Sequence, residues 1–580
     1  MPNRYQSFKL AIYCPVGSFQ GLSRRELEQD IAFFGRHLRV SKLYLESHRG
    51  GLSIGADELR ELKRFFESYG FETAGGITTT LPPEYRPGFE RTAGVVCYTD
   101  PASRDKLRAE VEVAASVFDE IILDDFFFTN CTCDQCIGQR GERTWEDFRL
   151  ELMTEVSRNL IIEPAKAVNP RVKLVIKYPN WIESFAGTGY NTADQPPLFD
   201  GIYTGTETRD PSITQQNLPR YASYSLLQWL EAVKPGGNGG GWFDAFDCSS
   251  IDHYLEQAYL TVLGKARELM LFSYRLHRDS VYVPPLGFQL EKLDRLAVEL
   301  GNPVGVTAYH PHHARGEDHL ADYLGMLGVP IAPTPHFPEA PRGTALLLTA
   351  AATRDPDVLG KLEAFLVKGG RAVVTSGFVE RLQNRGIERL TTLRPTGRSL
   401  DLRRYALDTT ICTFDEFFSA SDGIVFPVLE FDTNATWQCI VGFAGETNLP
   451  ILTLDRYNRG ELFALTVPHN PADLERLPSS VLTRLRRVLS LGLPACLGGP
   501  ARASLFLYDN DTLVVESFAP APTKWRIRTG AGLRLVALHA GEEAPVLEEE
   551  SREGSVYRVR LLPASFRAFR LVPGVPATRG

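Results

Sequence analysis

Three cysteines occupy six consecutive positions of this sequence, at Cys131, Cys133 and Cys136. Thiolates at this density are typical of a tetrahedral zinc site, which needs four ligands. Cys97, in the segment GVVCYTD, is the candidate for the fourth, because the strand-like segment before it would end on the same face of the fold. Four protein ligands close the coordination shell, so we expect a structural rather than a catalytic zinc ion. The alternative is a surface loop with three reduced thiols, which would be prone to oxidation.

Charged and aromatic side chains that could take part in catalysis or binding follow short apolar segments along the first half of the chain. Glycoside hydrolysis needs two carboxyl groups, one to donate a proton and one to attack or to activate water, and aromatic rings offer apolar faces to a sugar. The polar residues at these segment ends are Glu46, Asp124, Asp125, Lys177, Glu207, Arg209 and Asp244, and the aromatic ones are Tyr13, Phe127, Tyr178, Trp181, Tyr203, Trp242 and Tyr274. The set predicts a glycoside hydrolase acting on a small oligosaccharide or glycoside.

Roles within this set follow from the neighbours of each carboxylate. Asp125 precedes three phenylalanines, and apolar surroundings raise the pKa of a carboxyl group, so we expect it to be the proton donor. Its catalytic partner is Glu207 or Asp244. We favour Glu207, because Arg209 and the two threonines beside it would favour an ionised carboxylate. The expected substrate-binding residues are Asp124, Lys177, Tyr178, Trp181, Arg209 and Trp242.

Two further expectations concern the orientation of these side chains. Neighbouring residues of a strand face opposite sides, so only one of Asp124 and Asp125 should point into the active-site mouth. The other is free to cap the loop over the cysteines. Lys177 is able either to bind a substrate hydroxyl or carboxylate or to pair with Glu207, and the sequence leaves both open.

The elements that must position these residues alternate between strand and helix. Amphipathic helical stretches such as 56–70 and 104–118 separate most of the apolar strands. Eight strand–helix units in about 290 residues match a (β/α)8 TIM barrel, in which the chemistry lies at the carboxyl ends of the strands. We assign the barrel to residues 1–298. Its strand candidates are 9–14, 42–47, 72–78, 120–126, 173–179, 200–206, 240–246 and 269–274.

Two further domains are expected after the barrel. Residues 299–495 contain shorter α/β units, with strands at 345–351 and 371–377, and predict a Rossmann-like domain. This region has no G-x-G-x-x-G after a strand, so nucleotide binding is not supported. Residues 496–580 switch to an alternation of apolar and polar residues, which predicts a small C-terminal antiparallel β-sandwich.

The composition excludes several classes of protein. A net charge of −8 argues against a nucleic-acid partner. The absence of a run of about 18 apolar residues argues against a membrane span. The nine cysteines are odd in number and scattered, unlike a secreted disulfide framework. The first residues have no signal-peptide pattern, and we therefore expect a cytoplasmic protein.

The cysteine pattern resembles the zinc site of the glycoside hydrolase family 42 β-galactosidases, which have C-x-C-x-x-C after the fourth barrel strand and another cysteine upstream. Three segments of this chain resemble that family in the same order: ETAGGITTTLPPEYR, AGVVCYTDPASRDKLRAEVE and ARELMLFSY. The resemblance implies a barrel, a Rossmann-like trimerisation domain and a small β domain. It also implies a homotrimer and a retaining mechanism on a carbohydrate substrate.

The sequence departs from that family at both catalytic positions. Where the family has Asn-Glu at the end of the fourth strand, this chain has Asp124-Asp125, so Asp125 matches the acid/base position. Where the seventh strand of the family has a nucleophilic Glu, this chain offers Asp244 and Asp247. A non-hydrolytic carbohydrate-binding protein on the same scaffold is therefore the alternative function.

Two other interpretations are weaker. A glutamine-amidotransferase-like enzyme in residues 300–470 would need a nucleophilic cysteine, and Cys439 lacks the required turn after a strand. Four histidines cluster near the start of the second domain but lack the H-x-x-x-H spacing of a metal-binding helix. We expect a solvated or interdomain loop there, able to complete a neighbour's active site in a trimer. These histidines are His310, His312, His313 and His319.

Overall fold

The computed structural model describes residues 4–81, 94–209, 216, 218–407 and 416–574. The chain separates into two compact units, one of residues 1–218 and 222–298 and one of residues 219–221 and 299–580. The proline-rich segment 82–85, part of the family resemblance, lies outside the described residues. No helix of the described chain is long and apolar enough to cross a membrane.

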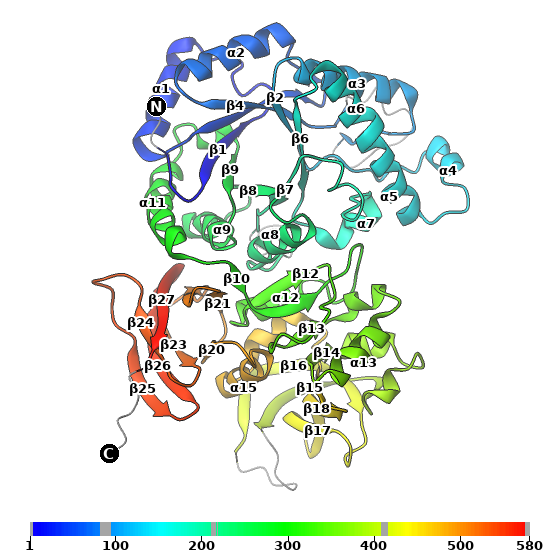
Figure 1. Ribbon diagram of the computed structural model, residues 1–580, viewed down its shortest axis with the longest axis vertical. Coiled ribbons are helices and arrows are strands. Elements are labelled where there is room, and N and C mark those ends of the chain that lie inside the picture. The colour runs from blue at the N-terminus through cyan, green and yellow to red at the C-terminus, as the bar shows by residue number, and fades with distance from the viewer. Residues whose placement is uncertain (1–3, 82–93, 210–215, 217, 408–415, 575–580) are drawn as a thin grey trace. The chain divides into compact units, whose positions relative to one another are not determined.

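The first unit is a closed parallel barrel of eight strands, as the sequence predicts. Each strand pairs in parallel with the next, and β1 pairs with both β2 and β9, which closes the ring (Figure 1). A short strand, β3 (Leu52–Ser53), extends β2 as an antiparallel hairpin. The barrel strands are β1 (Lys9–Cys14), β2 (Lys42–Arg49), β4 (Glu72–Ile77), β5 (Glu120–Leu123), β6 (Lys173–Tyr178), β7 (Gly201–Gly205), β8 (Asn238–Asp244) and β9 (Glu268–Phe272).

Helices surround this ring, and their ends are set by local sequence. Ser23 and Glu26 form a reciprocal capping box at the start of α1, and Asp100 caps α3, whose first residue is a proline. The helices are α1 (Arg24–His37), α2 (Ala56–Ser68), α3 (Pro101–Ala115), α4 (Asp134–Arg140), α5 (Trp145–Val156), the π-helix η3 (Ser157–Ile162), α6 (Glu163–Val168), the 3₁₀ turn η4 (Ile182–Ser184), α7 (Phe185–Thr188), α8 (Ala222–Val233), α9 (Ile251–Leu263), α10 (Tyr274–His277) and α11 (Val283–Glu299).

The interior of the barrel is filled by large side chains. Tyr13 and Trp242 pack with their ring centroids 4.5 Å apart, and the Tyr13 hydroxyl reaches Gly76 on β4. A Cβ at Gly76 would lie 2.5 Å from that hydroxyl oxygen, so this position needs a glycine. The close approach lets Tyr13 donate a hydrogen bond of 2.8 Å to Glu46 at the carboxyl end of β2.

The second unit contains a nine-stranded mixed sheet. Five strands run parallel, as the Rossmann-like prediction requires, and the sheet continues through antiparallel hairpins in residues 394–465. Its order is β12 (Ile331–Thr334), β11 (Val306–Tyr309), β13 (Leu346–Leu348), β14 (Arg371–Thr375), β19 (Gly460–Leu465), β18 (Thr447–Tyr457), β17 (Trp437–Ala444), β15 (Arg394–Leu407) and β16 (Phe418–Glu430). The helical elements of this region are α12 (Leu320–Met326), η5 (Ala350–Arg354), α13 (Val358–Val367), α14 (Ser376–Arg381), η6 (Ile387–Arg389), η7 (Pro471–Arg476) and α15 (Ser479–Leu489).

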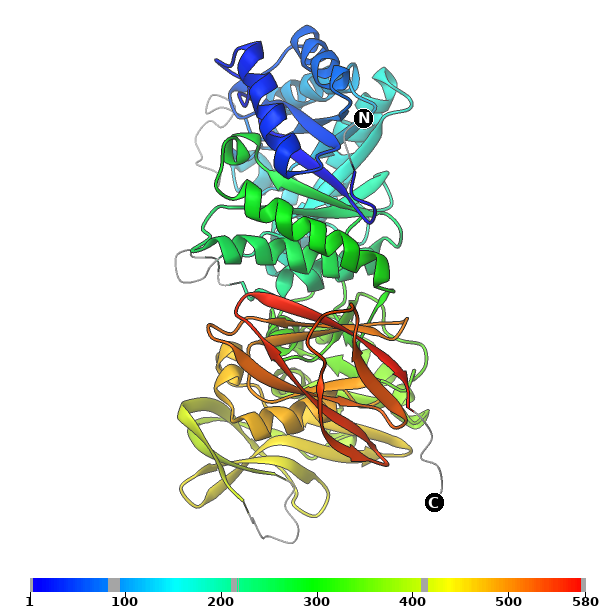
Figure 2. The ribbon, with the colours of Figure 1, turned by 90° about the vertical axis from the view of Figure 1, so that its left-hand side faces the viewer.

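The end of the chain forms the expected antiparallel β-sandwich. Its two sheets share one apolar core, in which Trp525 and Phe569 are fully buried, and Figure 2 shows their orange and red strands packed together. One sheet is β10 (Pro303–Val304), β21 (Ala503–Tyr508), β22 (Thr512–Ser517), β27 (Ser565–Pro573) and β24 (Leu533–Ala537); the other is β20 (Ala495–Gly498), β23 (Thr523–Thr529), β26 (Gly554–Leu561) and β25 (Val546–Ser551).

Candidate active site and metal centre

Lys177, the penultimate residue of β6, lies at the centre of a buried charge network at the barrel mouth. Its ammonium nitrogen is 2.7 Å from Asp125 Oδ2 and 3.1 Å from Glu207 Oε1. It also lies 3.8 Å from Asp124 Oδ1 and 4.3 Å from the centre of the Trp242 ring. Of the two roles that the sequence left open for this lysine, the structure shows the pairing with Glu207.

The expectation that only one of the two aspartates points into the mouth is wrong. β5 ends at Leu123, so Asp124 and Asp125 follow the strand rather than alternate along it. Asp124 therefore does not cap the loop over the cysteines. It is bound to Arg49 at 2.5 Å and accepts a hydrogen bond from Thr78 at 3.2 Å.

Arg49, the last residue of β2, is a site residue that the sequence analysis missed. Its guanidinium pairs with Glu46 at 2.9 Å and with Asp124, and so joins the ends of β2 and β5. Glu46 also accepts hydrogen bonds from Tyr13 and from the backbone N–H of Val16. The available signal was its position, because a charged residue at the carboxyl end of a barrel strand faces the mouth.

Glu207 follows β7 and is held differently from the expectation. Thr206 binds the Trp242 carbonyl, Thr208 pairs with Ser223, and Arg209 pairs with Asp244, so none of the three holds the Glu207 carboxylate. Lys177 does so instead, through Oε1. The other oxygen, Oε2, is buried and has no hydrogen-bond partner among the described residues, so it remains available to accept one.

Asp244, at the end of β8, is fully engaged by protein groups. Both of its carboxylate oxygens contact the Arg209 guanidinium, Oδ2 at 3.1 Å, and Oδ1 also accepts the backbone N–H of Phe246 at 2.8 Å. Burial raises the pKa of Asp244 to about 6, although the charge of Arg209 lowers it. Asp247 is exposed in the following loop. The Asp244 carboxylate is thus less available to a substrate than that of Glu207.

The two adjacent aspartates have opposite electrostatic environments. Burial raises the pKa of Asp125 to about 7, Asp124 and Glu207 add to the shift, and Lys177 opposes it. Burial acts in the same direction on Asp124, but Arg49, Lys177 and the hydrogen bonds of Asp125 lower its pKa below the usual value. When two neighbouring carboxyl groups have well-separated pKa values, the one with the higher pKa is suited to act as an acid and the other remains a fixed negative charge. Near neutral pH, Asp125 is therefore partly protonated and is able to donate a proton.

The aromatic candidates divide by burial. Trp242 and Tyr178 are buried, and Tyr178 packs against Phe185 and Tyr190, so both support the mouth from below. Trp181 is half-buried. Phe246, which the sequence analysis did not select, is 46% exposed and lies 5.8 Å below the Arg209 guanidinium. Trp181 and Phe246 thus offer accessible ring surface.

The four predicted cysteines converge in the first unit. Cys97 Sγ lies 3.7 Å from Cys131 Sγ, 3.7 Å from Cys133 Sγ and 3.8 Å from Cys136 Sγ. Cys97 is in the loop between β4 and α3 rather than at a strand end as expected, whereas Cys133 and Cys136 lie at and within the start of α4. All four sulfurs are within 4.8 Å of one another.

These distances fit a thiolate-bound metal. A disulfide would bring two sulfurs to about 2.0 Å. A zinc ion about 2.3 Å from four sulfurs would place them roughly 3.8 Å apart at the corners of a tetrahedron. Among the described residues, no other group of three or more histidine, cysteine or acidic side chains meets at such a spacing, and the four clustered histidines are not brought together as a metal site.

Three family models match the chain. Residues 1–283 match the model of a probable glycosyl hydrolase catalytic domain. The barrel is thus similar to a probable glycosyl hydrolase catalytic domain. Residues 301–470 match the second domain of the uncharacterized protein SSO3021, and residues 494–571 match a probable glycosyl hydrolase C-terminal domain. The match to residues 1–283 supports the expectation of a glycoside hydrolase barrel.

The chain is also similar to one protein by sequence and to several solved structures by fold. SSO3021 of Saccharolobus solfataricus is 28% identical over 363 residues, covering 56% of this chain, which spans 60% of that relative's length. A β-galactosidase from Bacillus circulans sp. alkalophilus has a TM-score of 0.63 at 11% identity, with 99% of each chain covered. Gan42B, a GH42 β-galactosidase from G. stearothermophilus, has a TM-score of 0.65 at 12% identity, with 98% of each covered.

A third similar structure belongs to an enzyme of another activity. The α-L-fucosidase isoenzyme 2 from Paenibacillus thiaminolyticus also has a TM-score of 0.65 at 12% identity, with 99% of this chain and 100% of that chain covered. At these identities the likeness establishes a shared fold of the barrel and the domains that follow it. The chain therefore has a fold similar to that of the family 42 β-galactosidases, as the cysteine pattern indicated.

Proposed function

We propose that this protein is a retaining glycoside hydrolase in which Asp125 donates the proton and Glu207 is the nucleophile. One observation carries the proposal: both carboxylates bind the ammonium of Lys177, and the second oxygen of Glu207 has no partner among the described residues. Since Asp125 Oδ2 and Glu207 Oε1 lie 2.7 and 3.1 Å from one nitrogen, they are at most about 5.8 Å apart. Retaining enzymes separate the two carboxyl groups by about 5–5.5 Å, and inverting enzymes by about 6.5–9.5 Å.

The chemistry proceeds in two steps on this chain's own residues. In the first, the Asp125 O–H bond breaks and its proton goes to the glycosidic oxygen as the bond to the anomeric carbon breaks, while Glu207 forms an ester with that carbon. In the second, Asp125 takes a proton from water, the water oxygen attacks the anomeric carbon, and Glu207 leaves. Lys177 orients both carboxylates, and Asp124 is held by Arg49 as a fixed negative charge.

The test uses Asp125→Asn and Glu207→Gln, which are close in size to the parent side chains. Glu207→Gln should lose turnover of both 4-nitrophenyl and alkyl glycosides by at least about 10³-fold, and Asp125→Asn should lose turnover of alkyl glycosides to a similar extent, as expected for removal of a catalytic carboxyl group. Both variants should still bind these glycosides. A β-galactoside and an α-L-fucoside are the first substrates to test, because the structural relatives include a β-galactosidase and an α-L-fucosidase. Asp247→Asn, an exposed carboxylate of the same mouth, is the control. A parent protein that binds sugars and turns over none of the panel would support the carbohydrate-binding alternative instead.

The remaining assignments belong to the same proposal. The cysteine cluster binds one structural Zn²⁺ through Cys97, Cys131, Cys133 and Cys136, as the sulfur spacing supports. The reduced thiols of such a site suit a reducing compartment, the cytoplasm. Residues 299–495 form a trimerisation domain and residues 496–580 a separate β-sandwich, on the resemblance to family 42. The substrate that the proposed homotrimer binds is a carbohydrate.

A further inference from the structure

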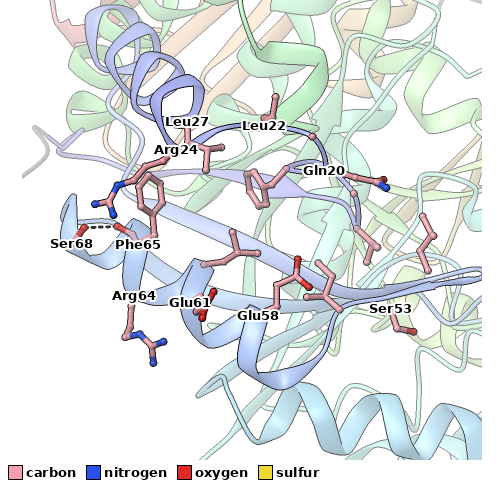
Figure 3. Close-up of a pocket in the computed structure, with 17 residues that line it drawn as sticks. Gln20, Leu22, Arg24, Leu27, Ser53, Glu58, Glu61, Arg64, Phe65 and Ser68 are labelled. Carbon is pink, nitrogen blue, oxygen red and sulfur yellow. Dashed lines mark hydrogen bonds between the residues drawn. The ribbon is translucent and has the colours of Figure 1, made fainter.

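A groove opens beside the mouth of the barrel, between α1 and α2 (Figure 3). Its volume is about 940 Å³, at the upper end of the range of ligand-binding clefts. Its walls are the loop between β1 and α1, the start of α1, the short strand β3 and the length of α2. None of the residues assigned above to catalysis, substrate binding or the cysteine cluster lines it.

Two residues that line this groove contact the charge network of the mouth. Val16, which lines the groove, donates its backbone N–H to Glu46 at 2.7 Å. Leu52, on the opposite wall, pairs with Arg49 in the β2–β3 hairpin. Glu46 and Arg49 together hold Asp124 in place. These contacts place one end of the groove beside the residues that hold Asp124, and we take this end as the route of a substrate chain from the mouth.

The groove combines an apolar floor with a balanced polar rim. The apolar part includes Phe19, Leu22, Leu27, Leu62 and Phe65. The rim supplies two carboxylates, two guanidinium groups and neutral polar side chains, and in Figure 3 Glu58 rises from α2 toward the loop that carries Leu22. The charged rim residues are Arg24, Glu58, Glu61 and Arg64, and the neutral ones are Gln20, Ser53 and Ser68.

This balance selects the ligand class. The two positive and two negative groups cancel, so the groove has no net preference for a polyanion or a polycation. In the described part of the chain, Glu58, Glu61 and Arg64 make no ion pair, and their charged groups are available as strong hydrogen-bond acceptors and donors. A neutral oligosaccharide presents hydroxyl groups to such a rim and C–H faces to an apolar floor.

We propose that this groove is an extended subsite that binds the distal units of a neutral oligosaccharide whose scissile bond lies at Asp125 and Glu207. The inference rests on the proposed function for the position of the scissile bond. It makes the substrate a chain of at least three sugar units, rather than a simple glycoside, and assigns Glu58 and Glu61 as specificity-determining residues.

The test measures binding, so that it does not depend on turnover. Calorimetry compares neutral galacto-, gluco-, manno- and xylotetraoses with their monosaccharides on the Asp125→Asn protein. The variant Glu58→Ala/Glu61→Ala removes the acceptors on the groove side of α2. Asp57→Ala/Glu67→Ala, on the same helix outside the groove, removes the same charge. Alanine keeps the helix in both, because it has the highest helix propensity.

The expected result is one tetrasaccharide that binds at least about tenfold more tightly than its monosaccharide. Glu58→Ala/Glu61→Ala should lose that advantage and leave monosaccharide binding unchanged, while the control keeps both. The proposed subsite would be overturned if every tetrasaccharide bound no more tightly than its monosaccharide. It would also be overturned if the variant and the control lost tetrasaccharide affinity equally. If the tetrasaccharide binds through the groove but the parent protein hydrolyses no glycoside, the catalytic proposal alone is refuted. If the parent hydrolyses aryl glycosides but Glu58→Ala/Glu61→Ala does not change tetrasaccharide binding, the subsite alone is refuted.

Discussion

At the scale of single residues, the account depends on the ionisation of Asp125. Its burial raises the pKa to about 7, and only the protonated form can donate to a leaving group. The parent kcat/KM should therefore be high below pH 7 and fall tenfold per pH unit above it. Measurement of kcat/KM from pH 5 to 9 checks this. A profile that stays flat through pH 8 would contradict the role of Asp125 as the acid.

Lys177 influences the pH above which kcat/KM falls, the alkaline limb of the profile. Its positive charge lowers the pKa of Asp125 against the effect of burial, so Lys177→Met should move the alkaline limb of kcat/KM above pH 7. The same variant leaves two buried carboxylates without their shared cation, and its melting temperature should fall by several degrees. A limb that stays in place would show that Lys177 does not act on the proton donor.

The sequence located the residues of this site more reliably than their partners. Asp125, Lys177, Glu207 and Asp244 were selected because strand ends meet at one face of a barrel. The first three do lie together, and Asp244 pairs with Arg209. The predicted barrel makes β6 and β7 neighbours and so left the pairing of Lys177 with Glu207 open, but spacing along the chain does not show that Arg209 turns to Asp244 instead. Arg49 was missed because its two partners come from different strands.

At the scale of elements, the barrel strands carry both the site and its packing constraints. Gly76→Ala would push a methyl group against the Tyr13 hydroxyl at 2.5 Å and disturb its hydrogen bond to Glu46. We expect a loss of about 1–3 kcal/mol in the free energy of unfolding. Chemical denaturation measures it, with Gly35→Ala as the control, because nothing lies within 4 Å of a Cβ there in α1. Equal stability of the two variants would exclude this packing constraint.

The loops after β4 and β5 carry the cysteine cluster. Purified protein should contain about one zinc ion per chain, since four thiolates complete one tetrahedral site. Cys133→Ser should lower the zinc content and the melting temperature, and leave kcat/KM largely unchanged below the unfolding temperature. Cys248→Ser, a half-buried cysteine of the same barrel, is the control. Metal-free parent protein of full stability would rule out a structural zinc ion.

The positions of the strands can be predicted closely from the sequence where the pattern of apolar residues is regular. All eight barrel strands lie within a few residues of the expected ranges, because alternation of apolar strands with amphipathic helices is a strong signal. The hairpins of residues 394–465 were not predicted. Many of their residues are exposed, as along Arg394–Leu407, so the apolar periodicity that marks a strand is weak there.

At the scale of the whole molecule, the assembly prediction comes from the family 42 resemblance. A homotrimer of the 64.6 kDa chain should have three times that mass in solution. Light scattering at micromolar concentration measures it directly. A monomer mass would refute the trimer and, with it, the possibility that the histidine cluster completes a neighbour's site.

The measurement that tests the central claim most directly is the leaving-group dependence of Asp125→Ala. An acid catalyst is needed for a poor leaving group and is dispensable for an activated one. The account predicts that this variant loses at least about 10³-fold in kcat/KM on an alkyl glycoside or oligosaccharide, and under about tenfold on the matching 2,4-dinitrophenyl glycoside. Equal loss on both substrates would show that Asp125 is not the proton donor.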